Sequence, residues 1–197
     1  MKIKITLVMS IMLSAVALGR ETETVKVPAE VQPFVKDHSK PIALEAADLN
    51  GDGREDFVLV VEREKPEIDN DGFPINQRPL LILVRGKNGK LTEAKRNEKI
   101  VYCSECGGRM GDPFQGVDVA KNTFTVKHYG GGGQRWSANY TFNYFKADKT
   151  WRLVRNEDET FHVADTENVN KKVKRRDDFG KIDIADFDPK TLEEQSN

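Results

Sequence analysis

The chain has 197 residues, with 31 Lys or Arg against 32 Asp or Glu, so its formal charge is −1. This balance gives no net positive field that would attract nucleic acid, and a hydrophobic fraction of 38% fits a domain with a core rather than a membrane bundle. Two cysteines are too few for a four-cysteine zinc site or a disulfide-stapled miniprotein. We therefore expect one water-soluble domain that binds no nucleic acid.

Residues 1–19 have the pattern of a secretory signal peptide. Lys2 and Lys4 precede an apolar run at 5–18 that, at about 1.5 Å per residue, is shorter than the ~30 Å hydrocarbon core of a bilayer. Small residues up to Gly19 then offer a cleavage site. The pattern predicts a periplasmic or secreted protein with no integral membrane segment after cleavage; the alternative is an uncleaved membrane anchor.

Beyond residue 42, patterns typical of β-strands dominate. Residues 57–61 and 80–84 are short apolar runs of the kind that is buried on both faces of a sheet, and residues 136–144 alternate apolar and polar side chains. Further strands are predicted at 42–46, 117–119, 124–128, 151–153 and 182–184, with a hairpin of 161–164 and 172–175 around 168–170.

One short helix is possible at residues 28–37, although Pro33 limits its length. No linker rich in Pro, Gly or Ser and no internal repeat divides the chain. The prediction is a mainly β fold: a single antiparallel domain over residues 25–190, at most one short N-terminal helix, and a disordered C-terminal end at 191–197.

The most specific motif is DLNGDGRED at residues 48–56, in which oxygen-bearing residues alternate and Gly53 allows a sharp turn. Hard cations such as Ca²⁺ take six to eight oxygen ligands. The donors would be the side chains of Asp48, Asn50, Asp52 and Asp56 and the backbone carbonyl of Arg54. Because the carboxylates repel one another, a divalent ion would stabilise the closed loop. The alternative is an acidic, glycine-rich turn without a metal.

This loop resembles the β-flanked calcium loops of FG-GAP and VCBS repeats, which read D-x-[DN]-x-D-G-x-x-D before an apolar strand. An EF-hand would need Glu where Leu59 stands. The motif occurs once, so the resemblance implies a structural Ca²⁺ and not a full propeller. The order of D-L-N-G-D-G, C-x-x-C-G-G, G-D-P-F, H-Y-G-G and D-F-G-x-I over residues 35–188 also resembles small secreted, β-rich bacterial proteins. That resemblance implies export and one domain, but no activity.

Cys103 and Cys106 form a C-x-x-C pair with three interpretations. An oxidising compartment favours a local disulfide that stiffens a turn. A redox-active pair would need a βαβ setting, which the neighbouring sequence lacks. Half of a zinc site would need further ligands, for which His128 is the nearest candidate.

Two glycine-rich segments, 107–116 and 130–133, frame the remaining candidates. If the segments meet in space, a polar and aromatic cluster would form from Asp112, His128, Tyr129, Arg135 and Trp136. Tyr129, Arg135 and Trp136 would then bind a sugar or an anionic group, and His128 with Asp112 is the acid–base pair that we nominate. The plainer alternative has two flexible loops, with Trp136 starting a core stripe and His128 satisfied within the sheet.

Two function classes follow. The first is an exported bacterial β-domain with a structural calcium loop, acting as a binding or envelope-associated module for a protein or glycan partner. The second is a secreted, hydrolase-like enzyme that uses Asp112, His128 and Arg135. A pocket into which His128 and Asp112 both turn would favour the enzyme, whereas a His128 buried among core groups would favour the module. The sequence makes no prediction of oligomeric state.

Overall fold

The computed structural model describes residues 25–36, 38–68, 70, 72, 74–75 and 77–194. The predicted signal peptide therefore lies outside the described residues. Helical segments are short: η1 (Gln32–Phe34), η2 (Gly108–Met110), α1 (Arg176–Phe179) and α2 (Pro189–Glu194). Within the described part of the chain, no helix has the length and apolarity that crossing a bilayer requires.

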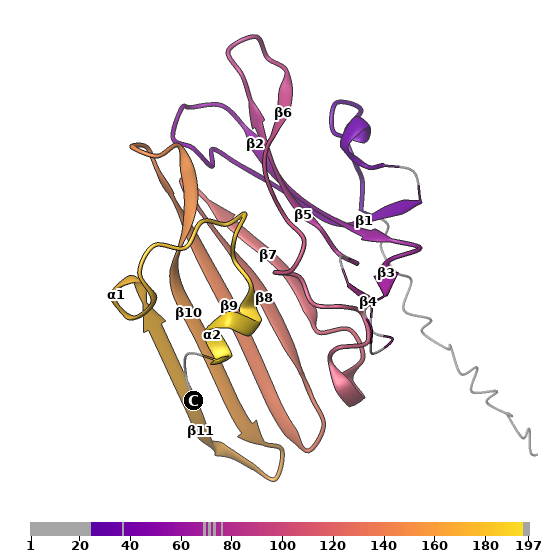
Figure 1. The fold of residues 1–197 in the computed structure, drawn as a ribbon, viewed down its shortest axis with the longest axis vertical. Coiled ribbons are helices and arrows are strands. Elements are labelled where there is room, and N and C mark those ends of the chain that lie inside the picture. The colour runs from indigo at the N-terminus through magenta and orange to yellow at the C-terminus, as the bar shows by residue number, and fades with distance from the viewer. Residues whose placement is uncertain are drawn as a thin grey trace, which may run out of the picture.

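Two antiparallel sheets make up the fold (Figure 1). The first has the order β1-β2-β5-β6, from β1 (Ser39–Ala47), β2 (Asp56–Arg63), β5 (Leu80–Arg85) and β6 (Leu91–Asn97). The second has the order β11-β10-β9-β8-β7, from β7 (Phe114–Ala120), β8 (Thr123–Gly131), β9 (Gln134–Phe145), β10 (Thr150–His162) and β11 (Asp165–Arg175). A small ribbon of β3 (Glu67–Ile68) and β4 (Pro74–Ile75) stands between β2 and β5 in the chain. The predicted mainly β, antiparallel fold is confirmed, and it is not a propeller.

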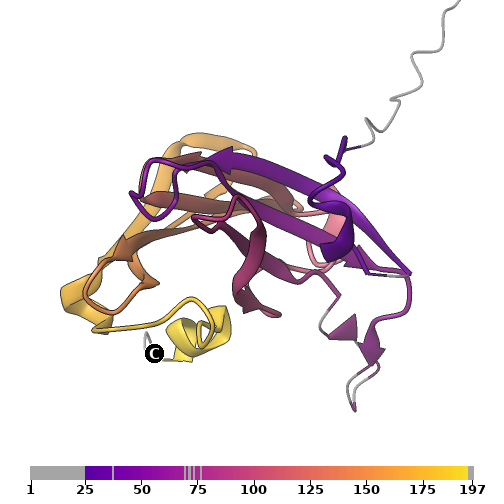
Figure 2. The same cartoon turned by 90° about the horizontal axis from the view of Figure 1, so that it is seen from above.

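The two sheets together form an arch. Strand β1 lies beside β7, and the C-terminal segment with α2 lies within the open side (Figure 2). Side chains from both sheets and from this segment meet in one core, to which Phe142, Leu153, Ile184 and Phe187 all belong. Each sheet has an apolar face that must be buried, and the two sheets bury these faces against each other in the arch.

Strands β2 and β5 are buried on both faces, as their apolar runs predict. Val58 and Ile82 face the core between the sheets, while Leu59 and Leu81 belong to a second cluster that Val31 covers. Val31 immediately precedes the 3-10 helix η1, so a short N-terminal helix is present but spans only Gln32–Phe34. Pro33 lies inside this turn, which agrees with the limit expected from its ring.

The predicted hairpin around residues 168–170 is wrong. His162 pairs with Asp165, so the turn lies between these two residues and 168–170 lie inside β11. The outer face of this hairpin is held by ion pairs, including Lys171 with Glu157 and Glu159. Because charged rather than apolar side chains alternate here, the apolar period that locates other strands is missing.

The C-terminal segment differs from the prediction in two further respects. Residues 182–184 do not form a strand but a single bridge, Asp183 with Arg152, along the part of β10 that β11 leaves uncovered. The end of the chain was expected to be disordered from residue 191, yet α2 continues to Glu194. Leu192 is only 3% exposed, and its burial in the core anchors this helix.

Candidate functional site

The inner face of the five-stranded sheet continues beyond the hydrophobic core as rows of mixed side chains. The register of β9, β10 and β11 sets three such rows: Tyr140, Asn156 and Lys174; Ala138, Asp158 and Lys172; Trp136, Thr160 and Asn170. Alternate residues of a strand share one face of a sheet, so these rows lie on the same face as Phe142 and Leu153. Here the inner face changes from apolar to polar.

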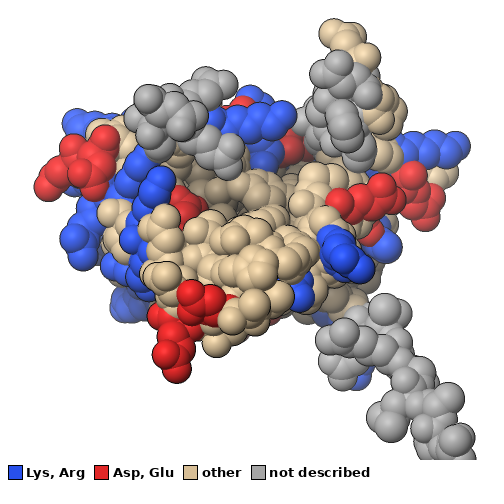
Figure 3. All heavy atoms as spheres, turned by 90° about the horizontal axis from the view of Figure 1, so that it is seen from below, with Lys and Arg blue, Asp and Glu red and all other residues tan. Residues whose placement is uncertain are grey.

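A groove of about 490 Å³ lies over these rows. The sheet forms its floor, Tyr102 forms part of one wall, and Pro189 and Leu192 of α2 form part of another. Seen from below, the molecule is hollowed, and Lys and Arg side chains gather on the side of β11 (Figure 3). The volume of the groove is within the range of small-molecule sites, about 300–1,000 Å³.

Asn156 lies at the floor of the groove and is 3% exposed. Its Nδ2 donates a hydrogen bond to Oδ2 of Asp158 at 2.7 Å, whereas its buried Oδ1 accepts none. A buried polar atom without a partner costs about 1–3 kcal/mol, and native proteins leave few of them. Asn156 therefore brings to the lining of the groove a buried acceptor that has no donor among the described residues.

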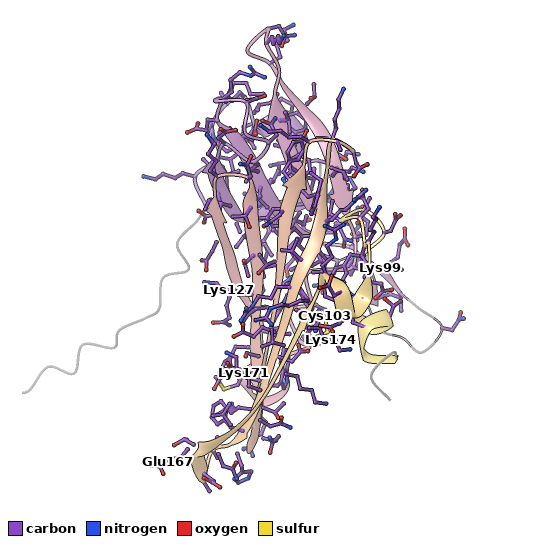
Figure 4. All side chains as sticks on the ribbon, turned by 90° about the vertical axis from the view of Figure 1, so that its left-hand side faces the viewer. Lys99, Cys103, Lys127, Glu167, Lys171 and Lys174 are labelled. Atoms are coloured by element: carbon purple, nitrogen blue, oxygen red, sulfur yellow. A yellow bond between two sulfur atoms is a disulfide. The ribbon has the colours of Figure 1, made fainter. Side chains whose placement is uncertain are left out.

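Asp158 and two lysines give the groove its charge. Burial raises the pKa of the Asp158 carboxyl, against the opposite effects of the bond from Asn156 and the charges of Lys174 and Lys172. Lys174 Nζ also donates to the backbone oxygen of Leu192 at 3.1 Å, which ties β11 to α2 (Figure 4). Asp158, Lys172 and Lys174 are the charged side chains among the described lining residues of the groove.

An aromatic wall borders the groove. A Cβ at Gly130 would lie 2.6 Å from Cζ2 of Trp136, so the indole rests against the backbone of β8 only because residue 130 is glycine. Tyr102 stands 5.9 Å from Trp136 between ring centroids, and its hydroxyl lies 2.7 Å from that of Tyr140. The indole is thus held in place before any ligand arrives.

His128 is buried rather than turned into the groove. It is 1% exposed, its ring stacks on Tyr102 with a centroid distance of 4.3 Å, and its Nε2 accepts a hydrogen bond from the Tyr102 backbone N–H at 3.3 Å. Burial lowers the pKa of His128 from 6.5 to about 4. At neutral pH it is therefore uncharged, and its buried Nδ1 has no hydrogen-bond partner among the described residues.

Asp112, the other half of the nominated acid–base pair, belongs to a separate ionic cluster. Both of its oxygens accept hydrogen bonds from Arg78, at 2.6 and 2.7 Å. Arg78 is 2% exposed and also donates to Glu62 through Nε at 2.8 Å, and Glu62 in turn pairs with Lys40 at 2.6 Å. Asp112 therefore balances a buried guanidinium, and neither Asp112 nor His128 lines the groove.

The three predicted ligand-binding residues do not converge. The two glycine-rich segments do meet, since Gly131 N–H donates to the Gly107 oxygen at 2.8 Å. However, the uninterrupted register of β8 and β9 places Tyr129 and Arg135 on the face of the sheet opposite to Trp136. Of these three, Trp136 alone lines the groove. The predicted cluster is divided by the sheet itself.

The Asp48–Asp56 loop closes through its own groups. Asp48 accepts from the N–H groups of Asp52 at 3.0 Å and Gly53 at 3.1 Å, and these bonds outweigh burial and lower its pKa. Asp56 is 0% exposed, and its two oxygens accept from the N–H groups of Leu49 and Arg85. Burial raises the pKa of the Asp56 carboxyl.

These side chains do not form a ready cation site. Arg54 pairs with Asp52, and no three His, Cys, Asp or Glu side chains among the described residues are grouped as metal ligands. The oxygen donors suit a hard cation in kind, and Gly51 and Gly53 have the positive φ values that the tight turn requires, 74° and 84°. A bound Ca²⁺ would have to displace Arg54 from Asp52.

The disulfide between Cys103 and Cys106 is present, with a Cα–Cα distance of 5.2 Å. It closes a turn directly after Tyr102, in which Cys106 N–H donates to the Cys103 oxygen at 3.1 Å. The predicted local bridge is confirmed, and it stiffens the segment that carries one wall of the groove.

Sequence reasoning missed the groove residues on β10 and β11. Asn156, Asp158, Thr160, Asn170, Lys172 and Lys174 share one face at a spacing of two. These residues could have been found because they alternate along each strand with charged residues that point outward. However, a bulge between Leu153 and Arg155 shifts this alternation by one residue relative to the apolar residues at the start of β10. It also missed Arg78, whose burial beside Glu62 and Asp112 depends on contacts between distant parts of the chain.

No family model, curated protein or solved structure matches the chain.

Proposed function

We propose that this protein is an exported binding module that holds a carbohydrate in the groove on the inner face of β9, β10 and β11. The observation that carries the proposal is the buried Oδ1 of Asn156, which has no hydrogen-bond donor among the residues that the structure describes. A ligand hydroxyl or N–H would satisfy it and recover the free energy that this unpartnered oxygen costs.

A carbohydrate matches the mixture of surfaces in this groove. Sugar rings present C–H groups on their faces and hydroxyl groups at their edges. The indole of Trp136 offers an apolar plane for such a face, while Asn156, Asp158 and Thr160 offer polar atoms for the edge. An apolar ligand would leave Asn156 and Asp158 unpartnered, and the cost of burying them favours a ligand rich in hydroxyls.

Several features favour binding over hydrolysis. Asp158 is the one carboxylate among the described lining residues, whereas glycoside hydrolysis ordinarily uses a pair of carboxyl groups. Of the two sequence candidates for acid–base work, His128 is 1% exposed within the sheet and Asp112 pairs with Arg78. A hydrolase-like function of the Asp112, His128 and Arg135 region has no comparable support.

The test is binding of the purified protein to an array of immobilised oligosaccharides. Trp136→Ala removes the aromatic plane, and Arg135→Ala is its matched control because it lies next in sequence but on the opposite face. We expect wild type and Arg135→Ala to bind the same sugars and Trp136→Ala to lose at least tenfold in affinity. A wild type that binds no sugar, or a Trp136→Ala variant that binds unchanged, would overturn the proposal.

A structural Ca²⁺ in the Asp48–Asp56 loop is a second, separate proposal. It is supported by the oxygen donors of the loop and by its resemblance to β-flanked calcium loops, and it requires the Arg54–Asp52 ion pair to open. At a dissociation constant near 10⁻⁴ M, millimolar Ca²⁺ would add about 1.4 kcal/mol to the free energy of unfolding.

Thermal melts in Ca²⁺ and in EDTA test this proposal of a calcium site. Wild type should melt at a higher temperature in Ca²⁺ than in EDTA, and Asp52→Ala should not. Equal melting of wild type in both buffers contradicts it.

A further inference from the structure

We propose that the carbohydrate held in this groove carries an acetamido group, whose methyl rests on Ala138 and whose N–H donates to Oδ1 of Asn156. The inference rests on the proposed function and narrows the ligand to N-acetylated sugars. Two features of the groove floor carry it. One is a small side chain between two aromatic rings, and the other is the buried amide oxygen on the neighbouring strand.

Ala138 is the small residue in an aromatic stretch of β9. Trp136, Ala138 and Tyr140 alternate along one face of the strand, and all three line the groove. Because alanine carries only a methyl group where each neighbour carries a ring, the groove floor is recessed over Ala138. Tyr102 closes another side, since its ring stacks at 4.3 Å on His128, the residue opposite Ala138 on β8. The recess is therefore apolar on three sides.

The fourth side of this recess is polar. Asp158 stands opposite Ala138 on β10, and Asn156 stands opposite Tyr140, one row further along the same face. Diagonal neighbours on adjacent strands, such as Ala138 and Asn156, lie about 7–8 Å apart. One small substituent can therefore rest on Ala138 and still reach Asn156.

The orientation of the Asn156 amide decides what this substituent must offer. Its Nδ2 donates to Asp158 at 2.7 Å, which leaves Oδ1 as the atom without a donor among the described residues. The amide oxygen and the carboxylate are both acceptors, so a ligand group at this point has to donate. The recess beside them requires an apolar group of about the size of a methyl.

An acetamido group meets both requirements within one planar unit. Its N–H donates and cannot accept, its methyl is apolar, and its carbonyl oxygen can face the open side of the groove, where water donates. A sugar hydroxyl would satisfy Asn156 but would leave the recess over Ala138 without an apolar partner. A free amino group is protonated at neutral pH, carries no methyl, and would lose hydration beside the aromatic rings.

The experiment compares glucose-based trimers that have the same glycosidic linkage and differ only in the substituent on the second carbon of each sugar: acetamido, propionamido, amino or hydroxyl. Isothermal titration measures their affinities for wild type, Ala138→Leu and Asn139→Leu. Ala138→Leu fills the recess. Asn139→Leu is the matched control, because it introduces the same side chain at the next residue, on the opposite face of β9. Circular dichroism shows whether each variant is folded.

We expect wild type to bind the acetamido trimer about tenfold more tightly than the hydroxyl trimer, because burial of a methyl adds to the hydrogen bond. The propionamido trimer should bind more weakly than the acetamido trimer because its longer chain exceeds the recess, and the amino trimer should also bind more weakly. Ala138→Leu should lose the preference for the acetamido group, and Asn139→Leu should keep it.

Equal binding of the acetamido and hydroxyl trimers to wild type would show that this inference is wrong while the carbohydrate site stands. A folded Ala138→Leu variant that keeps the preference would show the same. If Ala138→Leu does not fold, the propionamido trimer decides, because it probes the size of the recess in wild type: affinity equal to that of the acetamido trimer would overturn the inference. If no sugar of any kind binds, the proposed function itself fails.

Discussion

The inner face of the five-stranded sheet has two halves that do different work. Near the start of β10 it carries Trp151 and Leu153, both at most 2% exposed, against Phe142 of β9 and Phe187 of the C-terminal segment. Further along the same strands it carries Asn156, Asp158 and Trp136 around a groove. Both halves belong to the same paired strands. They differ in the segments that cover them and in the side chains that they carry.

Within one sheet, the covered half serves stability and the open half serves binding. In the covered half, apolar side chains contribute free energy of folding through burial. In the open half, a buried amide oxygen without a partner reduces that free energy, and a binding site is where such a cost is expected. Substitutions in the two halves should therefore affect stability and binding in opposite proportions.

The largest effect is expected from the covered half. Phe142→Ala removes a fully buried ring that stacks on Phe124 at 5.2 Å, and should lower the free energy of unfolding by about 3–5 kcal/mol. Thr160→Ala, in the groove, should change it by less than about 0.5 kcal/mol. Urea unfolding followed by circular dichroism measures both. Similar losses for the two variants would remove the distinction between the halves.

His128, which pairs with Ala138 in the open half, gives stability a pH dependence. Its folded pKa of about 4 is below the ordinary value of 6.5, so the unfolded chain takes up a proton more readily than the folded protein. The free energy of unfolding should therefore fall by about 3 kcal/mol as pH drops from 6.5 to 4. In His128→Gln the fall over this range should be smaller by about that amount; an unchanged slope would place the pH dependence elsewhere.

The disulfide should have a moderate effect on stability and a local effect on binding. Its ring is so short that loop entropy predicts a loss of only about 2 kcal/mol for the Cys103→Ser, Cys106→Ser variant. Because the turn follows Tyr102, sugar affinity should also fall. Denaturant unfolding and array binding of the double variant measure the two effects. A fully unfolded variant would show that the disulfide stabilises the whole domain and not this turn alone.

A small stability change is also expected at the groove floor. Asn156→Leu removes the unpartnered oxygen but also the hydrogen bond to Asp158, so the free energy of unfolding should change by less than about 1 kcal/mol. Binding of the preferred sugar should nevertheless be lost. Paired unfolding and titration experiments check this; a loss of 3 kcal/mol or more, with binding retained, would make Asn156 a core residue rather than a ligand contact.

The two halves also differ in how far the sequence predicts them. Trp151, Leu153 and the apolar residues of β9 follow the period of two that marks a strand, and the run at 57–61 is long enough to indicate burial on both faces. The groove residues of β10 and β11 follow the same period, but their polar side chains look like a solvated surface. Only the pairing of three strands brings them together.

The errors at the candidate site have the same origin. Tyr129, Arg135 and Trp136 are close in sequence, and the sheet places them on opposite faces. Asp112 and His128 were paired by residue type, yet each found another partner, Arg78 and the Tyr102 backbone. The Cys103–Cys106 bridge was predictable because its two ends are local.

The two tryptophans of the chain allow one direct test of the account, since one lies in each half. Their indole N–H signals in a ¹H–¹⁵N spectrum can be followed while the oligosaccharide that binds best on the array is added. We predict that the Trp136 signal shifts and saturates, while that of Trp151, whose indole donates to the Leu49 oxygen at 2.9 Å, stays in place. A shift of Trp151 alone, or a saturating interaction that moves neither signal, would contradict a binding site in the groove.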